Sequence, residues 1–251
     1  MKIDIHVHSS ERSSCGRSSE EEIIRSAIVH GLDAIVFTDH NEFIPDDRLI
    51  ELNEKYRPFK IFKGIEVSVP KEHVLVIGLD DTSLESEDWT YEDLHKFVRD
   101  NSAYMAIAHP FRYRDYINAD LNIYPPDAIE THSANTTKDT RPSIYEMIQK
   151  HDLKEICTSD AHHVDRVGIF YNELNYPARD ERELTEILKA GEYTCKAMQD
   201  RVDKINEDIE AIEERINVLH GQGKSVNEIR EIIGIHKSRI ESILEGVSYK
   251  I

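Results

Sequence analysis

The sequence feature that most constrains the fold is the position of the histidines and carboxylates. His6 and His8 lie in the strand-like run Ile3 to Val7. Later apolar runs end or begin with side chains of the same kind, namely His40, Glu66, His73, His109, Asp160 and His162. A barrel of parallel strands brings the ends of its strands together on one face. The pattern therefore predicts one site built from residues that are far apart in the sequence.

The residue types in this pattern indicate a metal centre. Imidazole together with carboxylate is typical of zinc, manganese or iron sites, whereas calcium prefers oxygen ligands alone. Because side chains alternate along a strand, His6 and His8 share one face. A single histidine is more often a surface or packed residue, so the prediction rests on the whole set and on no single member.

Six short motifs, in this order, resemble the PHP (polymerase and histidinol phosphatase) family: His-x-His, Thr-Asp-His-Asn, Gly-Ile-Glu-Val-Ser, His-Val-Leu, Ala-His-Pro and Ser-Asp-Ala-His. The resemblance covers residues 1 to 195. It implies an α/β fold, a distorted seven-stranded (β/α) barrel with up to three metal ions at the C-terminal ends of the strands. It also implies the hydrolysis of phosphoesters.

Carried over residue by residue, the resemblance implies a set of metal ligands. The first site resembles one built from His6, His8, Glu66 and Asp160. Glu66 would bridge to a second site with His73 and His109, and His40 and His162 would be two ligands of a third. We therefore expect two or three divalent ions, zinc, manganese or iron.

The third site departs from the family pattern. The family usually has Ser-Asp-Gly after His-x-His, whereas this chain has Ser14-Cys15-Gly16. Cys15 could bind as a thiolate, which would favour zinc or iron. Glu11 could reach the site from the same loop, or the third site could be weak or empty. The sequence leaves these three alternatives open.

The expected chemistry is attack on phosphorus by a metal-bridging hydroxide. Glu66 and Asp160 are the central carboxylates of this mechanism, and Asp39 could orient a ligand ring or simply form a loop turn. His132 and His163 are candidates for protonating the leaving oxygen.

Arginine side chains suit phosphate because their planar fork matches its oxygens. Arg112 and Arg114 follow Ala-His-Pro directly, and Arg17 and Arg166 lie in loops after other strands. We expect these four to contact substrate, and Phe111 and Tyr113 could flank a substrate ring or pack in the core.

The leading hypothesis is a metal-dependent phosphoesterase acting on a phosphomonoester or phosphodiester of a small metabolite or nucleotide. An alternative within the family is a histidinol-phosphate phosphatase. An alternative of another class is a DNA-binding regulator that uses the barrel as a ligand sensor. The loops carry no motif that names a substrate.

Alternating strand-like and helix-like segments indicate a mainly parallel sheet over residues 1–197. Residues 198–251 form a separate, all-helical extension. Its first part has a heptad seam of Val202, Ile205, Ile209, Ile212, Ile216 and Leu219. Such a stripe predicts packing on the barrel or homo-oligomerisation through residues 202–219.

Residues 224–246 resemble a helix-turn-helix, with Lys237, Ser238 and Arg239 at the start of the second helix. Residues 223–250 carry five basic and four acidic side chains, which is weak for DNA binding. The formal net charge of −18 also argues against non-specific electrostatic binding to nucleic acid. The charge therefore argues against nucleic-acid contact through this segment, whereas its helix-turn-helix pattern allows it.

The remaining composition suits an enzyme of the cytoplasm. Three widely spaced cysteines indicate no disulfide framework, and a reducing compartment is the simpler explanation. No charged-then-apolar leader opens the sequence, and no apolar run approaches the length of a membrane span. We therefore expect no membrane partner.

Overall fold

The computed structural model describes residues 1–86, 88–112 and 114–251. Contacts divide the chain into two compact units. The first comprises Met1–Thr136 and Thr140–Met198, and the second comprises Thr137–Asp139 and Gln199–Ile251.

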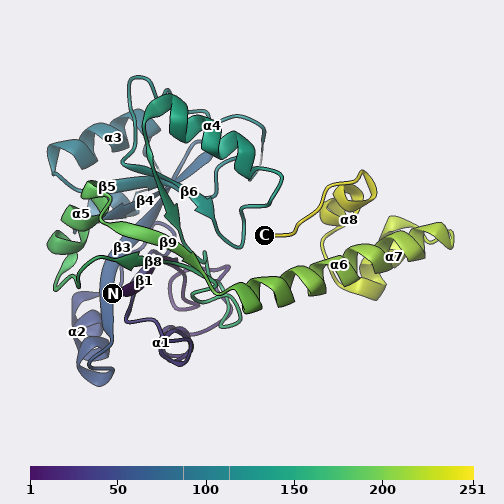
Figure 1. The fold of residues 1–251 in the computed structure, drawn as a ribbon, viewed down its shortest axis with the longest axis horizontal. Helices are drawn as coiled ribbons and strands as arrows, with labels where there is room; N and C mark the ends of the chain where they lie inside the picture. Colours follow the sequence, from purple (N-terminus) through teal and green to yellow (C-terminus); the bar gives the residue numbers. More distant parts are fainter. Residues whose placement is uncertain (87, 113) are drawn as a thin grey trace. The chain divides into compact units, whose positions relative to one another are not determined.

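The first unit is built on a nine-stranded sheet in the order β7-β6-β5-β4-β3-β2-β1-β8-β9 (Figure 1). Its strands are β1 Lys2–Val7, β2 Ala34–Phe37, β3 Lys60–Val69, β4 Glu72–Ile77, β5 Tyr104–Ile107, β6 Ala128–His132, β7 Lys154–Cys157, β8 Phe170–Leu174 and β9 Tyr193–Ala197. Its helices are α1 Glu20–Val29, α2 Asp46–Lys55, α3 Tyr91–Asp100, α4 Arg141–His151 and α5 Glu181–Ala190, with a short 3₁₀ turn, η1, at Thr82–Glu85. The helices surround the strands (Figure 1).

The sheet is mixed, which corrects the expectation of a mainly parallel one. Strand β4 runs antiparallel to both β3 and β5, and the β8–β9 hairpin runs antiparallel to β1. The connection from β3 to β4 is only Pro70 and Lys71, with Lys71 at a φ of 79°. A parallel crossover needs a dozen or more residues, so this short connection can only form a hairpin.

The sheet curls into a nearly closed barrel, as the α/β barrel prediction requires. The strands number nine instead of seven, because β8 and β9 extend the sheet beyond β1. The side chain of Asn172 on β8 connects to β7 at the other end of the sheet. Its Oδ1 accepts from the Cys157 backbone N–H at 3.2 Å, and its Nδ2 donates to the Cys157 carbonyl at 2.8 Å.

Strand β1 carries both apolar side chains of the core and polar side chains of the candidate site. Ile3 and Ile5 are fully buried and pack with apolar side chains of β2, β4, β5 and α5. Asp4, His6 and His8 alternate with them and are also fully buried. Two further apolar clusters lie beneath α1 and α2 and beneath α3 and α4. Strand β1 therefore buries polar side chains as well as apolar ones, which is typical of a strand that carries a functional site.

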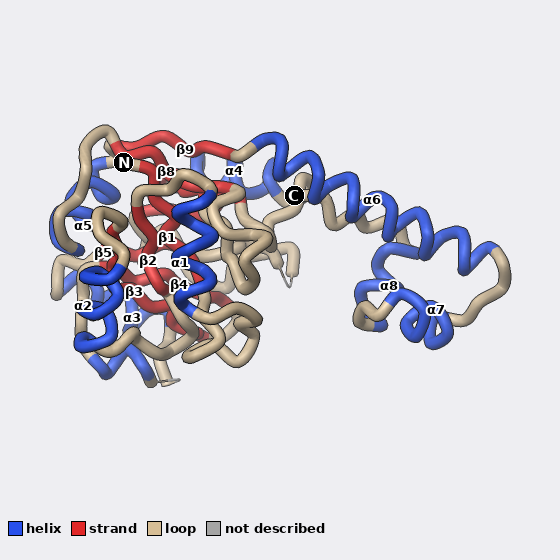
Figure 2. Tube along the Cα trace, turned by 90° about the horizontal axis from the view of Figure 1, so that it is seen from below, coloured by secondary structure: helices blue, strands red, loops and turns tan. Residues whose placement is uncertain are grey.

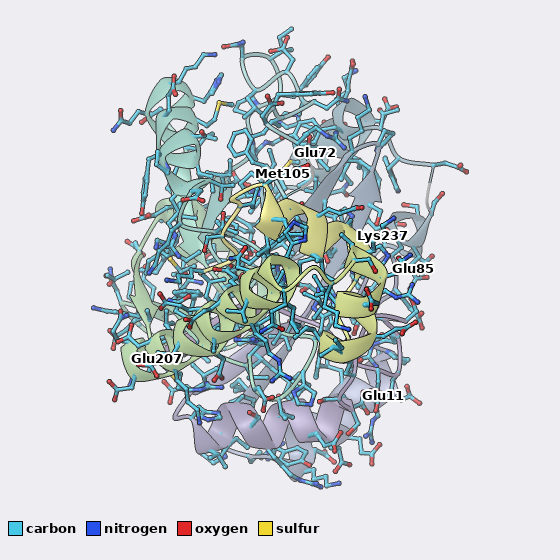
Figure 3. The ribbon with its side chains drawn as sticks, turned by 90° about the vertical axis from the view of Figure 1, so that its right-hand side faces the viewer. Glu11, Glu72, Glu85, Met105, Glu207 and Lys237 are labelled. Atoms are coloured by element: carbon cyan, nitrogen blue, oxygen red, sulfur yellow. The ribbon has the colours of Figure 1, made fainter. Side chains whose placement is uncertain are left out.

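The second unit consists of α6 Gln199–Gly221, α7 Val226–Ile233 and α8 Lys237–Leu244 (Figure 2). Figure 3 labels Glu207 on α6 and Lys237 at the start of α8. Ile216 of the heptad seam is fully buried, together with Ile229 of α7 and Ile240 of α8. The end of the seam is thus covered by the hairpin that follows it, an outcome that the seam alone did not predict.

The chain end is held within this second unit. The Asn206 side chain accepts from the Ile251 backbone N–H at 2.8 Å and donates to the Ile251 carbonyl at 2.9 Å. In the part of the chain that the structure describes, no helix is both long and apolar enough to cross a membrane.

Candidate metal centre

The predicted ligands meet because their strands end at one edge of the barrel. His6 and His8 come from β1, Glu66 from β3, and His109 follows β5. Isolated β-bridges pair His40 with Glu66 and Val7 with Ala161. These bridges extend the strand pairing beyond the regular strands. The antiparallel direction of β4 explains why His73 contributes from the start of its strand: it pairs with Ser68 near the end of β3.

Glu66 lies at the centre of the cluster, and its two oxygens face different imidazoles. Oε1 lies 3.0 Å from His73 Nδ1 and 3.1 Å from His109 Nε2. Oε2 lies 3.3 Å from His6 Nε2 and 3.1 Å from His8 Nε2. It also lies 3.0 Å from His40 Nδ1. Glu66 is fully buried. One carboxylate therefore joins two groups of metal-type ligands.

Asp160 faces the same rings from the loop after β7. Its Oδ1 lies 3.3 Å from His6 Nε2 and 3.2 Å from His8 Nε2. It also lies 3.4 Å from His162 Nδ1. The Asn135 amide donates to the other oxygen, Oδ2. Asp160 has a φ of +48°, a region that non-glycine residues seldom occupy and that is often found at functional sites.

Polar partners orient the His6 and His8 rings. His6 Nδ1 lies 3.0 Å from Glu130 Oε1. His8 Nδ1 lies 3.2 Å from Ser13 Oγ, which donates to Asp39 at 2.7 Å. Protons on the two Nδ1 atoms leave both Nε2 lone pairs facing each other, 3.0 Å apart. Two facing lone pairs repel, unless a cation lies between them and the carboxylates.

Unpaired buried atoms give an independent test of whether a metal fits. Among the residues that the structure describes, Glu66 Oε2, Asp160 Oδ1 and His40 Nδ1 are buried without a hydrogen bond. Such atoms are costly without a partner. Four sets of side chains have ligand atoms within 4.8 Å of one another: His8, His40 and His162; His6, His109 and Asp160; His6, His8 and Glu66; and His40, Glu66 and His73. The donor set fits divalent metal ions.

The electrostatics of the cluster keep its carboxylates ionised. Burial raises the pKa of Glu66, but the surrounding imidazoles, His6 first, outweigh it and hold the pKa well below its usual range. Burial likewise raises the pKa of Asp160, and His6, His8 and His109 reverse the shift. Both oxygens of each carboxylate therefore remain electron-pair donors at neutral pH.

Cys15 lies where the family pattern has an aspartate. Burial raises the pKa of its thiol, but hydrogen bonds with His162 and His40 lower it to about 5. Glu11 lies elsewhere, because its Oε2 accepts from the Glu20 backbone N–H at the start of α1. A Cβ on Gly16 would lie 2.5 Å from the Ser9 carbonyl oxygen, so glycine lets this loop pack closely. Of the two side chains considered for the third site, the structure brings Cys15 to it.

Several supporting residues were not predicted. Glu130 is fully buried; besides His6 it accepts from the His109 backbone N–H at 2.7 Å and from the Thr158 hydroxyl. Its position in the apolar run Ala128 to Thr131 was the available signal, because a carboxylate inside such a strand needs partners. Asp39 orients His8 through Ser13, and accepts from Arg12 at 2.8 Å. This geometry favours the orienting role among the two considered for Asp39.

Asp4 is a second buried carboxylate that the sequence analysis missed. It accepts from the Ser159 and Gly168 backbone N–H groups at 3.0 Å each. Burial raises its pKa to about 6. These bonds fix the loop that carries Asp160.

The structure does not bring the two proposed proton donors into the cluster. His132 Nδ1 lies 2.9 Å from Thr131 Oγ1 and 3.4 Å from Cys157 Sγ, and the ring packs near Phe170. His163 lies beside Asp165, with Nδ1 3.0 Å from Oδ2, and is half-buried. The described contacts of both rings are with residues other than Glu66, and for His132 the register of β6 and β7 shifts between Glu130 and His132.

The four predicted arginines lie in different settings. Arg112 Nη1 is 3.9 Å from Asp160 Oδ2, and Arg114 Nη1 is 4.0 Å from Glu72 Oε1. Both line a small cavity of about 80 Å³ that also contains His73 and His109. Arg17 is exposed, with its backbone N–H bonded to the His162 carbonyl, and Arg166 is half-buried in the loop after β7. Arg112 and Arg114 are therefore best placed to contact a substrate.

The two candidate ring neighbours have different outcomes. Phe111 lines the same cavity, with a φ of 64°, and packs partly against the cluster beneath α3 and α4. Tyr113 lies outside the described residues.

The fold and the site together define a class: a distorted α/β barrel with histidines and carboxylates gathered at the strand ends. The family model of the PHP domain matches residues 4–190. The chain belongs to the PHP family, as its motifs predicted. No curated protein matches the sequence.

Solved structures share the fold at low sequence identity. PsfC from Pseudomonas syringae is 20% identical, with a TM-score of 0.60 over 80% of this chain and 92% of PsfC. A two-domain protein from Bacteroides vulgatus, which contains a predicted PHP-like metal-dependent phosphoesterase, is 20% identical, with a TM-score of 0.61 over 78% of this chain and 64% of that one. The lesion-specific endonuclease PfuEndoQ from Pyrococcus furiosus is 19% identical, with a TM-score of 0.54 over 77% of this chain and 57% of that one.

Proposed function

We propose that this protein is a metal-dependent phosphoesterase that acts on a small phosphorylated metabolite or nucleotide. The observation that carries the proposal is the position of Glu66, whose two oxygens face separate groups of imidazoles. Sites in which one carboxylate joins two metal ions are common in phosphatases and nucleases. Membership of the PHP family and the similarity to structures named as phosphoesterases support the same activity.

The proposed ligands divide into three groups. His6, His8 and Asp160 would hold the first ion, His73 and His109 would hold the second, and Glu66 would be shared by both. His40, His162 and Cys15 would hold a third ion. When bound, such ions supply a hydroxide nucleophile near neutral pH and offset the negative charge on the phosphoryl oxygens. The mixture of imidazole, carboxylate and thiolate suits zinc, iron or manganese.

Protein side chains perform the remaining steps. Glu130 and Ser13 hold His6 and His8 in the tautomer that keeps Nε2 free, and Asn135 holds Asp160. Arg112 donates to the phosphoryl oxygens, because it is partly exposed and lies beside Asp160. His132 takes no part in proton transfer, since it contacts Thr131 and Cys157 instead. Solvent at the open edge protonates the leaving oxygen.

A screen of phosphorylated compounds tests this function. Purified protein with added manganese, zinc or iron should release inorganic phosphate or cleave a phosphodiester. Glu66→Ala serves as the matched control for contaminating phosphatases. If no compound is cleaved by metal-loaded protein, or if the Glu66→Ala protein cleaves equally well, the proposed function is wrong.

The alternative of a DNA-binding regulator is not favoured by the contacts of α8. Lys237 Nζ lies 3.5 Å from Glu241 Oε1, and the Arg239 guanidinium stacks 4.3 Å from the centre of the Tyr249 ring. These two cations would have to leave their partners to reach DNA. We infer that α7 and α8 serve mainly to pack against α6.

A further inference from the structure

Two cysteines outside the metal cluster meet where the barrel closes. Cys157 ends β7, and Cys195 lies opposite Asn172 in the β8–β9 hairpin. The Asn172 side chain bonds to the Cys157 backbone in both directions, and Cys195 Sγ lies 3.8 Å from the same Asn172 Oδ1. The side chains of Cys195 and Cys157 also interact with each other. Strand closure therefore brings into contact two thiols that are far apart in the sequence.

The surroundings make these two thiols unequal. Cys157 Sγ lies 3.4 Å from His132 Nδ1 and 3.5 Å from Thr131 Oγ1. Burial raises the pKa of the Cys157 thiol, but hydrogen bonds from Cys195 and His132 lower it to about 6. The pKa of Cys195 is raised, first by its bond to Cys157 and then by burial. These contacts favour the thiolate on Cys157 and the protonated thiol on Cys195.

The charged and titratable groups around the pair favour this arrangement. Arg141, at the start of α4, interacts electrostatically with Cys157, and its Nε is buried without a hydrogen bond in the described chain. Glu155 and Tyr193 lie on the Cys195 side and oppose a second thiolate. A thiolate beside cationic groups and a protonated second thiol is the usual arrangement of reactive dithiols.

We propose that Cys157 and Cys195 form a redox site, separate from the metal cluster, that hydroperoxides oxidise to a disulfide across the seam of the barrel. The role found for His132 supports this assignment, because the ring faces Cys157 and takes no described part in the metal cluster. The phosphoesterase activity neither supplies nor requires this chemistry.

The reaction balances in two steps. The Cys157 thiolate attacks one oxygen of the hydroperoxide: an S–O bond forms, the O–O bond breaks, and the other oxygen leaves as hydroxide or alkoxide and takes up a proton. The Cys195 sulfur then attacks the Cys157 sulfenic acid: an S–S bond forms, the S–O bond breaks, and the hydroxide leaves as water with the Cys195 proton. The two thiols lose two electrons and the peroxide gains them.

Access limits the class of oxidant. Cys157 is only 3% exposed, and Cys195 is partly exposed on β9, the last strand of the sheet. A small hydroperoxide is therefore a better oxidant for this pair than a bulky reagent. Cys15 is exposed and lies by the metal cluster, so its oxidation must be separated from that of the pair.

The experiment uses the zinc-loaded full chain with Cys15→Ser, because zinc is not redox-active. After treatment with hydrogen peroxide, free thiols are counted in denaturant and the peptides are mapped without reduction. Both thiols should disappear together, with a peptide that links residues 157 and 195 and that dithiothreitol separates. In the added Cys195→Ser variant, the sulfenic acid should persist on Cys157 and react with a cyclic dione once the protein is unfolded in denaturant.

Two further variants distinguish a reactive pair from mere proximity. Cys157→Ser should leave Cys195 unoxidised, and His132→Asn should slow the oxidation of Cys157 about tenfold at pH 7, since fewer thiolates are present. Circular dichroism and zinc content establish that each variant is folded. The proposal is overturned if fully oxidised parent protein lacks the linked peptide, or if Cys157 in the folded chain reacts no faster than it does in denaturant.

Discussion

At Glu66, the two oxygens of one carboxylate face five imidazoles from four different segments of the chain. The His6 and His8 rings are also held by partners of their own, Glu130 and Ser13. At the scale of single residues, the site is therefore a set of ligands whose orientation is fixed before a metal binds. Removing the Glu66 carboxylate and removing the Asp160 carboxylate should therefore weaken the binding of different sets of metal ions.

Glu66→Ala should lower phosphoesterase activity by at least about 100-fold, because charge-stabilising and ligand groups typically contribute this much. Both central metal ions should bind more weakly together. Asp160→Ala should cause a similar loss of activity but weaken mainly the ion held by His6 and His8. Turnover numbers with metal content from elemental analysis test this. Near-native turnover and full metal content in Glu66→Ala would contradict the assignment of the bridge.

Cys15→Ser should reduce the metal content by about one ion and leave the ions at Glu66 in place, because the serine hydroxyl is not ionised near neutral pH. Cys15→Asp, which restores the side chain usual in the family, is the matched control and should regain the third ion. Elemental analysis of protein purified without chelator measures both. Equal metal content in the wild type and both variants would show that Cys15 is not a ligand.

At the scale of elements, helix α7 depends on a capping box. Ser225 Oγ accepts from the Glu228 backbone N–H, and the Glu228 carboxylate accepts from the Ser225 backbone N–H at 2.9 Å. These bonds to Ser225, with Lys224, lower the pKa of Glu228 to about 2. A group whose pKa is lower in the folded state stabilises the fold above its unfolded pKa and loses that effect as the pH falls.

The contribution of Glu228 to α7 should therefore be complete above pH 4.5 and disappear as the pH falls towards about 2. Its exposed position makes the effect small and sensitive to salt. Nuclear magnetic resonance of the side-chain carboxyl measures the pKa directly, and amide exchange in α7 measures the stability. In Glu228→Gln, exchange in α7 should lose this dependence on pH. Titration of Glu228 at its ordinary value of 4.5 would contradict the cap.

At the scale of the whole molecule, the chain combines a barrel with a helical unit that has its own apolar cluster. Val202, Ile205 and Ile216 of the heptad seam are buried, but Ile212 is 39% exposed. Self-association through residues 202–219 stays a prediction, since an exposed isoleucine within the seam gives a second copy an apolar contact.

A chain that ends at Met198 should keep its central metal ions and its phosphoesterase activity, because the proposed ligands all lie before residue 199. It should differ from the full chain in oligomeric state or solubility. Light scattering and metal analysis of both chains test this. Loss of the metal ions in a folded, truncated barrel would contradict the division of roles.

DNA binding is tested on the full chain by titration at several salt concentrations. Weak binding that decreases steeply with salt is expected, since the net charge is −18 and the cations of α8 already have partners. Sub-micromolar, sequence-selective binding at physiological salt would instead identify residues 224–246 as a recognition module.

The sequence by itself determined the barrel class and the set of ligand-type residues. Histidines at strand ends and alternation along β1 are local patterns, so they could be recognised without coordinates. The same patterns placed Glu66 among the central residues. The cysteine at position 15, where the family usually has an aspartate, marked the third metal site as the one whose ligands were open.

Only the tertiary structure decided which way side chains turn and which strands meet. His132 was a reasonable proton donor by its position, but β6 directs it towards Cys157, whereas the neighbouring Glu130 faces His6. Cys157 interacts with Cys195, and Ile216 is buried with side chains of α7 and α8. In both cases no repeat in the sequence links the segments that meet. Such contacts depend on barrel closure and helix packing, which bring together residues whose separation along the chain carries no signal.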